Sequence, residues 1–230
     1  MALAQMIGSD NGPRVIAVDG PSASGKGTVA ARVAEALGFH YLDSGALYRL
    51  VAVAASRSGV SMAAEAALAD LALGLDVSFK NNELWLNHEN VSEVARGEET
   101  SAAASQVAAF PAVRVALLQR QRAFRQPPGL VADGRDMGSV VFPDATLKVF
   151  LTADRAIRAE RRHKQLMGKG MCVKIATVVE ELQRRDERDS SRPVAPLRHY
   201  PDARLLDTTH LSIAEAVETI LGWYRERVGQ

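Results

Sequence analysis

The segment that most restricts how this chain can fold is the glycine-rich run between residues 20 and 28. It follows the β-branched, apolar run Arg14–Asp19, which predicts a buried strand, and it leads into Thr28–Leu37, which has helical character and stops at Gly38. A strand, a glycine-rich loop and a helix in this order form the opening unit of a nucleotide-binding fold. Glycines let consecutive backbone N–H groups converge on a phosphate, and the helix adds the positive end of its dipole. The predicted phosphate-binding loop comprises Gly20, Pro21, Ser22, Ala23, Ser24, Gly25, Lys26, Gly27 and Thr28.

Lys26 and Gly27 indicate which kind of phosphate-binding loop this is. A lysine at this position reaches the β- and γ-phosphates of a nucleoside triphosphate. The strict motif has Ser or Thr directly after the lysine, but here Gly27 takes that place and Thr28 follows. This Gly-Lys-Gly-Thr form resembles the nucleoside-monophosphate kinases, and the sequence has no Asn-Lys-x-Asp motif of a guanine-reading GTPase. The alternative reading is a chance turn rich in Gly and Ser.

Hydrophobic periodicity along the rest of the chain favours an α/β fold. About five short strands separated by helices predict a parallel sheet that is covered on both faces. Two alternating runs, Asp76–Phe79 and Glu83–Leu86, predict a small hairpin about the Asn81-Asn82 turn. The other expected strands are Phe39–Asp43, Leu130–Ala132, Leu147–Leu151 and Arg204–Asp207, and the other expected helices are Gly45–Ala55, Ala63–Leu75, Glu93–Phe124 with an interruption at Pro111, Asp154–Leu166, Val178–Arg188 and Ile213–Val228.

Three further segments carry side chains that could hold a second, anionic nucleotide. In the first, residues 42–49, Ser44 and Arg49 could bind a phosphate; an ordinary helix cap with a surface arginine is the alternative. The second, residues 132–138, follows a predicted strand, where ligands sit in open α/β sheets; the alternative is a polar turn. The third, residues 184–192, alternates in charge and reads on its own as a solvated helix face. Together with Arg161 and Arg162, it could instead close over a polyphosphate.

These motifs together resemble the bacterial cytidylate kinases, from about Arg14 to the C-terminus. The motifs are Gly-Pro-Ser-x-x-Gly-Lys-Gly-Thr, Leu-Asp-Ser-Gly-x-x-Tyr-Arg, Ala-Ser-Gln-Val-Ala, Asp-Gly-Arg-Asp-Met-Gly and Arg-Asp-x-Arg-Asp-x-x-Arg, in this order. The resemblance implies a three-layer nucleoside-monophosphate (NMP) kinase fold with a five-stranded parallel sheet, a small antiparallel sheet inserted in its NMP-binding part and a basic lid. We expect a flexible tail over residues 1–12 and one kinase domain over 13–230, with the insertion at about 61–112 and the lid at about 154–192.

The resemblance also implies roles for individual residues. It assigns Lys26, Arg135, Arg162 and Arg188 to catalysis. It assigns the acceptor phosphate of CMP to Ser44, Arg49, Arg135 and Arg192, the cytosine to Ser105, Arg114 and Asp136, the ribose to Arg185 and Asp189, and Tyr48 to the same CMP site. Mg²⁺ is expected to be bound mainly through the ATP phosphates and water, with no direct protein ligand.

The expected reaction is in-line transfer of the γ-phosphate of ATP to CMP and dCMP. Asp136 and Ser105 would accept hydrogen bonds from the cytosine amino group, which uracil lacks, so UMP should be a poor substrate. The alternatives are another small-acceptor kinase, for AMP, UMP or a small metabolite, and a nucleotide-dependent switch or binding module without transfer activity.

Composition restricts the setting. The formal net charge is only +1, which argues against a dedicated nucleic-acid binder. The single cysteine, Cys172, permits no intrachain disulfide, and neither a signal peptide nor a transmembrane run is evident. We therefore expect a cytoplasmic monomer that has no membrane or nucleic-acid partner.

Overall fold

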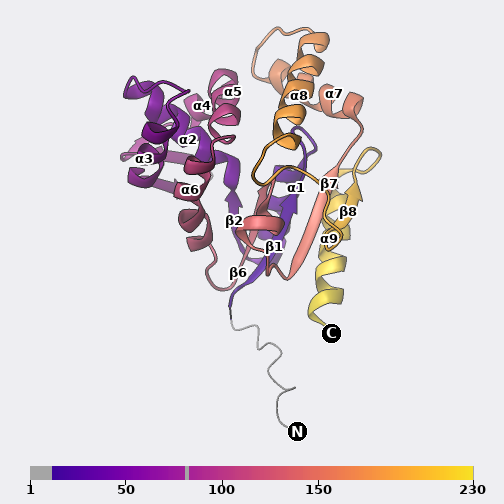
Figure 1. Ribbon diagram of the computed structural model, residues 1–230. Coiled ribbons are helices and arrows are strands. Elements are labelled where there is room, and N and C mark those ends of the chain that lie inside the picture. The colour runs from indigo at the N-terminus through magenta and orange to yellow at the C-terminus, as the bar shows by residue number, and fades with distance from the viewer. Residues whose placement is uncertain (1–11, 81–82, 230) are drawn as a thin grey trace.

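A five-stranded parallel sheet forms the centre of the protein (Figure 1). The computed structural model describes residues 12–80 and 83–229. The strands lie in the order β2-β6-β1-β7-β8, and every neighbouring pair is parallel. Their bounds are β1 Arg14–Asp19, β2 His40–Asp43, β6 Gly129–Gly134, β7 Leu147–Thr152 and β8 Arg204–Asp207. The α/β fold with a parallel sheet that the sequence predicted is thus confirmed.

Helices cover both faces of the sheet. Successive side chains of a strand point to opposite faces, so each buried strand contributes apolar residues to two cores. Val15 and Ala17 of β1 pack on one face with α2 (Ser44–Arg57) and α6 (Pro111–Ala123). Ile16 and Val18 pack on the other face with α1 (Lys26–Leu37) and α9 (Ile213–Val228). Three layers result, and the carboxyl ends of the strands meet at one edge of the sheet.

An insertion with a second, antiparallel sheet follows α2. It contains α3 (Glu65–Gly74), β3 (Val77–Lys80), β4 (Glu83–Leu86), β5 (Glu89–Asn90), α4 (Ser92–Ala95) and α5 (Glu98–Val107). The predicted hairpin is confirmed as the β3–β4 pair. Its Asn81-Asn82 turn lies outside the described residues, as does the predicted tail except for Gly12. The sequence did not predict β5, and the helical run that it predicted from Glu93 breaks twice before Pro111 opens α6.

Two helices rich in charged residues, of which only the first is basic, lie across from this insertion. They are α7 (Arg155–Gly168) and α8 (Ile175–Ser190), which Figure 1 shows above the carboxyl ends of the strands, across from α5. Asp154 caps α7 by accepting a hydrogen bond from the Ala156 N–H. A separate small core that includes Leu166, Val178 and Leu182 joins the two helices. We call residues 154–192 the lid segment.

A second element that the sequence analysis did not predict follows β6 after two residues. Residues Met137–Val141 form a single π-helical turn, η1. Such turns are rare and frequently lie at functional sites.

The helices were also compared with the length of a membrane span. Among the described residues, no single helix is long and apolar enough to cross a membrane. Helices α5 and α6 would pass this test together, but the chain bends by 102° between them.

Two glycines offer a test of this packing. A Cβ atom at Gly20 would lie 2.0 Å from the backbone oxygen of Leu151, whereas one at Gly222, inside α9, would meet nothing within 4 Å. We expect Gly20→Ala to lower the free energy of unfolding by about 3 kcal/mol, because backbone must shift to accommodate the methyl group. Gly222→Ala should raise it by about 1 kcal/mol, since alanine favours the helix. Urea denaturation measures both, and a Gly20→Ala variant as stable as the wild type would contradict the close approach of β1 and β7.

Candidate active site

The phosphate-binding loop leaves the end of β1 and opens α1. Gly25, at φ 92°, is the N-cap residue of α1. Because glycine has no side chain, it caps none of the first N–H groups of the helix. The first turn of α1 carries no acidic side chain. Uncapped N–H groups and the helix dipole together favour an anion at this point. The loop therefore has the geometry that its sequence predicted.

Lys26 begins α1 beside two carboxylates at strand ends. Its Nζ donates to the backbone oxygen of Pro21 at 3.3 Å. Burial and then the charge of Arg135 lower the pKa of Lys26 to about 8, although Asp133 and Asp43 oppose this shift. A buried ammonium group with so few hydrogen-bond partners is stabilised by an anion placed next to it.

Asp43 is the last residue of β2, and it lies opposite Asp133, the next-to-last residue of the neighbouring strand β6. Burial, and then the like charge of Asp43, raise the pKa of Asp133 to about 6. The Tyr41 hydroxyl donates to Asp133 Oδ1 at 2.7 Å. Asp43 accepts from Arg49 Nη2 at 2.5 Å and from the Ala46 N–H at 3.1 Å. Burial alone would raise the pKa of Asp43, but Arg49 lowers it below its ordinary value.

A pocket of about 230 Å³ opens between the phosphate-binding loop, the insertion and the lid segment. We call it the acceptor pocket. Every residue that the sequence analysis assigned to the CMP site lines it, and so do Lys26 and Arg162. The assigned residues are Ser44, Tyr48, Arg49, Ser105, Arg114, Arg135, Asp136, Arg185, Asp189 and Arg192. The structure thus gathers on one surface side chains that are up to about 150 positions apart in the sequence, as parallel strands permit.

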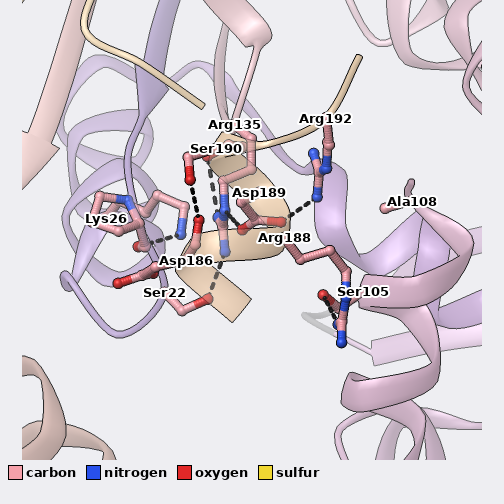
Figure 2. Close-up of polar contacts among 12 residues, drawn as sticks. Ser22, Lys26, Ser105, Ala108, Arg135, Asp186, Arg188, Asp189, Ser190 and Arg192 are labelled. Carbon is pink, nitrogen blue, oxygen red and sulfur yellow. Dashed lines mark hydrogen bonds and ion pairs between the residues drawn. The ribbon is translucent and has the colours of Figure 1, made fainter. Parts of the chain in front are cut away.

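Asp189 joins the lid segment to the core. Its side chain is 4% exposed, and its two oxygens accept from Arg135 Nε at 2.6 Å and from Arg192 Nη2 (Figure 2). Arg135 also donates to the Ser22 hydroxyl of the phosphate-binding loop at 2.8 Å. Burial would raise the pKa of Asp189, but Arg135 and Arg192 lower it below its ordinary value. The ionised carboxylate therefore holds Arg135 beside the phosphate-binding loop and pairs with Arg192 through its other oxygen.

Two arginines in this region carry buried donor atoms that are left without a partner among the described residues. Arg49 Nε and Arg192 Nε are buried and, among the described residues, have no hydrogen-bond partner. A buried donor left unpaired costs free energy, which an anionic oxygen would recover. The two side chains thus favour an anion in this pocket in addition to one at the phosphate-binding loop.

A separate ion pair forms the part of the pocket next to the insertion. Arg114 of α6 pairs with Asp136, which follows β6, and their side chains are 9% and 4% exposed. Burial raises the pKa of Asp136, although Arg114 and Arg192 oppose this. Arg114 also donates to the backbone oxygen of Ala108 at 3.3 Å. The pair offers both donor and acceptor groups to a planar ligand.

Two arginines assigned to catalysis contact the insertion. Arg188 Nη1 donates to the Ser105 hydroxyl at 2.8 Å, and Figure 2 shows it directed away from Lys26. Arg162 pairs with Glu98 at the start of α5 and donates to Gln165 at 2.7 Å. Arg188 is not among the residues that line the pocket, whereas Arg162 is.

Sequence reasoning did not single out several polar groups of the site. Asp43 and Asp133 lie inside the motifs that it used, but no role was assigned to them. Arg158 is 8% exposed, donates to the backbone oxygen of Ser22 at 3.1 Å and pairs with Asp186 at 2.7 Å, so it ties the lid segment to the phosphate-binding loop. Its place one helical turn before Arg161 and Arg162 is the only signal that the sequence offered. Among the described residues, no group of three or more His, Cys, Asp or Glu side chains could hold a metal ion.

Comparison with known proteins gives one consistent result. The sequence model of the cytidylate kinase family matches residues 16–226. The chain is 59% identical to a cytidylate kinase of Chromobacterium violaceum, over 93% of this chain and 96% of that protein. It is 56% identical to a cytidylate kinase of Nitrosomonas europaea, over 92% of this chain and 95% of that one. A solved gluconokinase from Sinorhizobium meliloti, at 16% identity over 93% of each chain and a TM-score of 0.45, is too distant to bear on the site.

The pKa of Lys26 predicts how nucleotide binding depends on pH. A phosphate requires the protonated ammonium form, whose pKa is about 8 in the free protein. We therefore expect the affinity for ATP, measured by calorimetry, to fall above about pH 8 by up to about tenfold per pH unit. Lys26→Arg is the control, because arginine stays protonated, and its affinity should vary far less over the same range. A wild-type affinity that is constant to pH 10 would contradict the assignment.

Proposed function

Because the chain belongs to the cytidylate kinase family, we propose that it transfers the γ-phosphate of ATP to CMP and dCMP, giving ADP and CDP or dCDP. The observation that carries the proposal is the acceptor pocket itself. Lys26 of the phosphate-binding loop lines the same pocket as several arginines, and a protein that binds a single nucleotide would not need this second set of cationic side chains. Pyrimidine nucleotide metabolism in the cytoplasm is the proposed setting.

The acceptor residues divide by the part of CMP that each would bind. We propose that Ser44, Arg49, Arg135 and Arg192 hold the acceptor phosphate and that Arg185 and Asp189 hold the ribose. The unpaired Nε atoms of Arg49 and Arg192 support the first assignment. Tyr48 supports the base-binding side chains, since the Arg114 guanidinium lies 5.9 Å from the centre of its ring.

Cytosine would be recognised at the Arg114–Asp136 pair. Arg114 can donate to the ring nitrogen and the carbonyl, while Asp136 and the Ser105 hydroxyl can accept from the amino group. Uracil has a carbonyl in place of that amino group, so Asp136 would face an acceptor. The burial of the pair supports this proposal. If Asp136 lost its hydrogen-bond donor in this buried site, water could not take the donor's place, so the mismatch would cost free energy.

The proposed transfer needs no protein base. The second ionisation of the acceptor phosphate lies near pH 6, so its oxygen is largely deprotonated at neutral pH. This oxygen attacks the γ-phosphorus as the bond to the β–γ bridging oxygen of ATP breaks. Lys26, Arg135, Arg162 and Arg188 are the proposed catalytic residues, which would neutralise the charge on the transferred group. In the structure Arg162 and Arg188 contact Glu98 and Ser105, so both would have to turn toward the phosphates.

The site also fits Mg²⁺ bound with ATP. Burial and Asp43 raise the pKa of Asp133 to about 6, and a divalent cation near this carboxylate pair would relieve their repulsion. We propose that Asp133 and Asp43 hold water molecules of the metal's hydration shell, while the phosphates are its direct ligands. Bound in this way, the metal would supply charge neutralisation at the β- and γ-phosphates.

We also propose a role for each of the two segments that flank the pocket, the insertion and the lid segment. We propose that the insertion at about 61–112 binds the acceptor and that the lid segment excludes water when it closes. The contact of Arg158 with Ser22 supports coupling between the lid segment and the phosphate-binding loop. We propose a monomer, because this chain supplies both anion-binding sets by itself, and we propose no nucleic-acid or membrane partner.

The test is ADP formation from ATP and Mg²⁺ with CMP, dCMP, UMP and AMP offered separately. We expect rapid turnover with CMP and dCMP and at least about a hundredfold lower kcat/KM with UMP and AMP. Lys26→Ala should abolish turnover and keep the wild-type thermal midpoint, whereas Lys148→Ala, which removes a lysine paired with Asp202 outside the pocket, should remain active. Activity confined to another acceptor would replace CMP as the substrate. Inactivity with all four would favour a binding module.

A further inference from the structure

Asp19, the last residue of β1, connects two parts of the site and has no role in the function proposed so far. Its side chain does not point into the acceptor pocket. Instead, Oδ1 accepts from the Met137 N–H and Oδ2 from the Gly138 N–H, each at 2.8 Å. One carboxylate that directly precedes the phosphate-binding loop therefore binds the backbone just after the loop that carries Arg135 and Asp136.

The two N–H groups need such a partner because they begin the π-helical turn η1. Within this turn, Phe142 N–H donates to Met137 O at 2.7 Å and Val141 N–H donates to Asp136 O at 3.2 Å. The first N–H groups of any helical turn have no acceptor inside it. No side chain of the segment caps this turn. Asp19 thus takes the place of an N-cap residue, although it is more than one hundred positions away in the sequence.

The capped turn has little freedom to move. A Cβ atom at Gly138 would lie 3.1 Å from Lys148 Cγ and 3.4 Å from Ala17 Cβ, so the turn packs directly on the sheet. Burial raises the pKa of Asp19 to about 7, although both N–H groups oppose this. Keeping the Asp19 carboxylate ionised in this position therefore costs free energy. The turn that Asp19 caps begins directly after Asp136.

We propose that Asp19 is a positioning residue for the acceptor nucleotide: by capping η1 from β1, it holds the backbone at Asp136 so that this side chain and Arg114 meet the base. The inference rests on the proposed function. It deepens that function by adding a specificity determinant that does not touch the substrate. It also gives the end of β1 a second task beside leading into the phosphate-binding loop.

Asp19→Asn is the decisive variant, because it keeps the shape and removes one of the two acceptors. The amide presents its oxygen to one N–H and its own N–H group to the other. Loss of one charged hydrogen bond predicts about a tenfold rise in the KM for CMP and about a tenfold fall in the CMP-to-UMP ratio of kcat/KM. The KM for ATP should stay within about twofold. Asp202→Asn is the matched control, since the Asp202 side chain lies near the same segment, is 60% exposed and pairs with Lys148.

The outcomes separate positioning from a general structural role. A KM for ATP that rises as much as that for CMP would overturn the inference, as would an unchanged CMP-to-UMP ratio. Thermal denaturation reports whether Asp19→Asn folds, and Asp19→Glu, which keeps the charge but moves the carboxylate, is the second variant if it does not. Failure of both to fold would also overturn it, because Asp19 would then be a requirement of the fold. A wild-type protein that does not phosphorylate CMP would instead refute the proposed function.

Discussion

The buried carboxylate of Asp189 is the group on which the rest of the site depends. It holds Arg135, from the end of β6, and Arg192, from the end of the lid segment, against each other despite their like charges. Buried ion pairs contribute little net stability, because desolvation offsets most of their attraction. Their concentration around one pocket is therefore better explained by binding than by folding. In the function that we propose, Asp189 preorganises the two arginines for an anion, and its pair with Arg135 also joins the lid segment to the core.

The charged side chains of the site lie close together because neighbouring strands of the sheet are parallel. Asp19, Asp43 and Gly134 end adjacent strands, and the segments that follow them supply the phosphate-binding loop, α2 and the Arg135–Asp136 loop. Ligands bind at this edge of open α/β sheets because the loops of neighbouring strands converge there. Residues of the insertion and of the lid segment line the pocket from two sides. Figure 1 shows the helices that carry them, α5 and α8, facing each other beyond the strand ends. The fold supplies the position, and the charged side chains supply the chemistry.

Sequence reasoning was successful where a local pattern carries the information. The apolar run of β1 predicts a strand, the glycines after it predict a loop, and the hydrophobic period of α9 predicts a helix. The motifs around Ser44 and Asp136 also singled out residues that line the pocket. It missed β5 because a two-residue strand has no period. It missed η1 because the residue that caps this turn, Asp19, lies 118 positions away from Met137 in the sequence. Which arginine pairs with which carboxylate could not be predicted either. Arg162 with Glu98 and Arg158 with Asp186 are partners that only the fold brings together.

If the Arg114–Asp136 pair recognises the cytosine amino group, as we propose, a substrate without that group should be used poorly by the wild type. The substrate is the monophosphate of pyrimidin-2-one riboside, which carries hydrogen in place of that amino group and adds no new acceptor. With the wild type, kcat/KM should fall roughly a hundredfold relative to CMP, because Asp136 is left without its donor. With Asp136→Ala, the two substrates should differ by less than about threefold, since the partner of the amino group is already absent. Equal use of both substrates by the wild type, or the same hundredfold loss in the variant, would contradict the account.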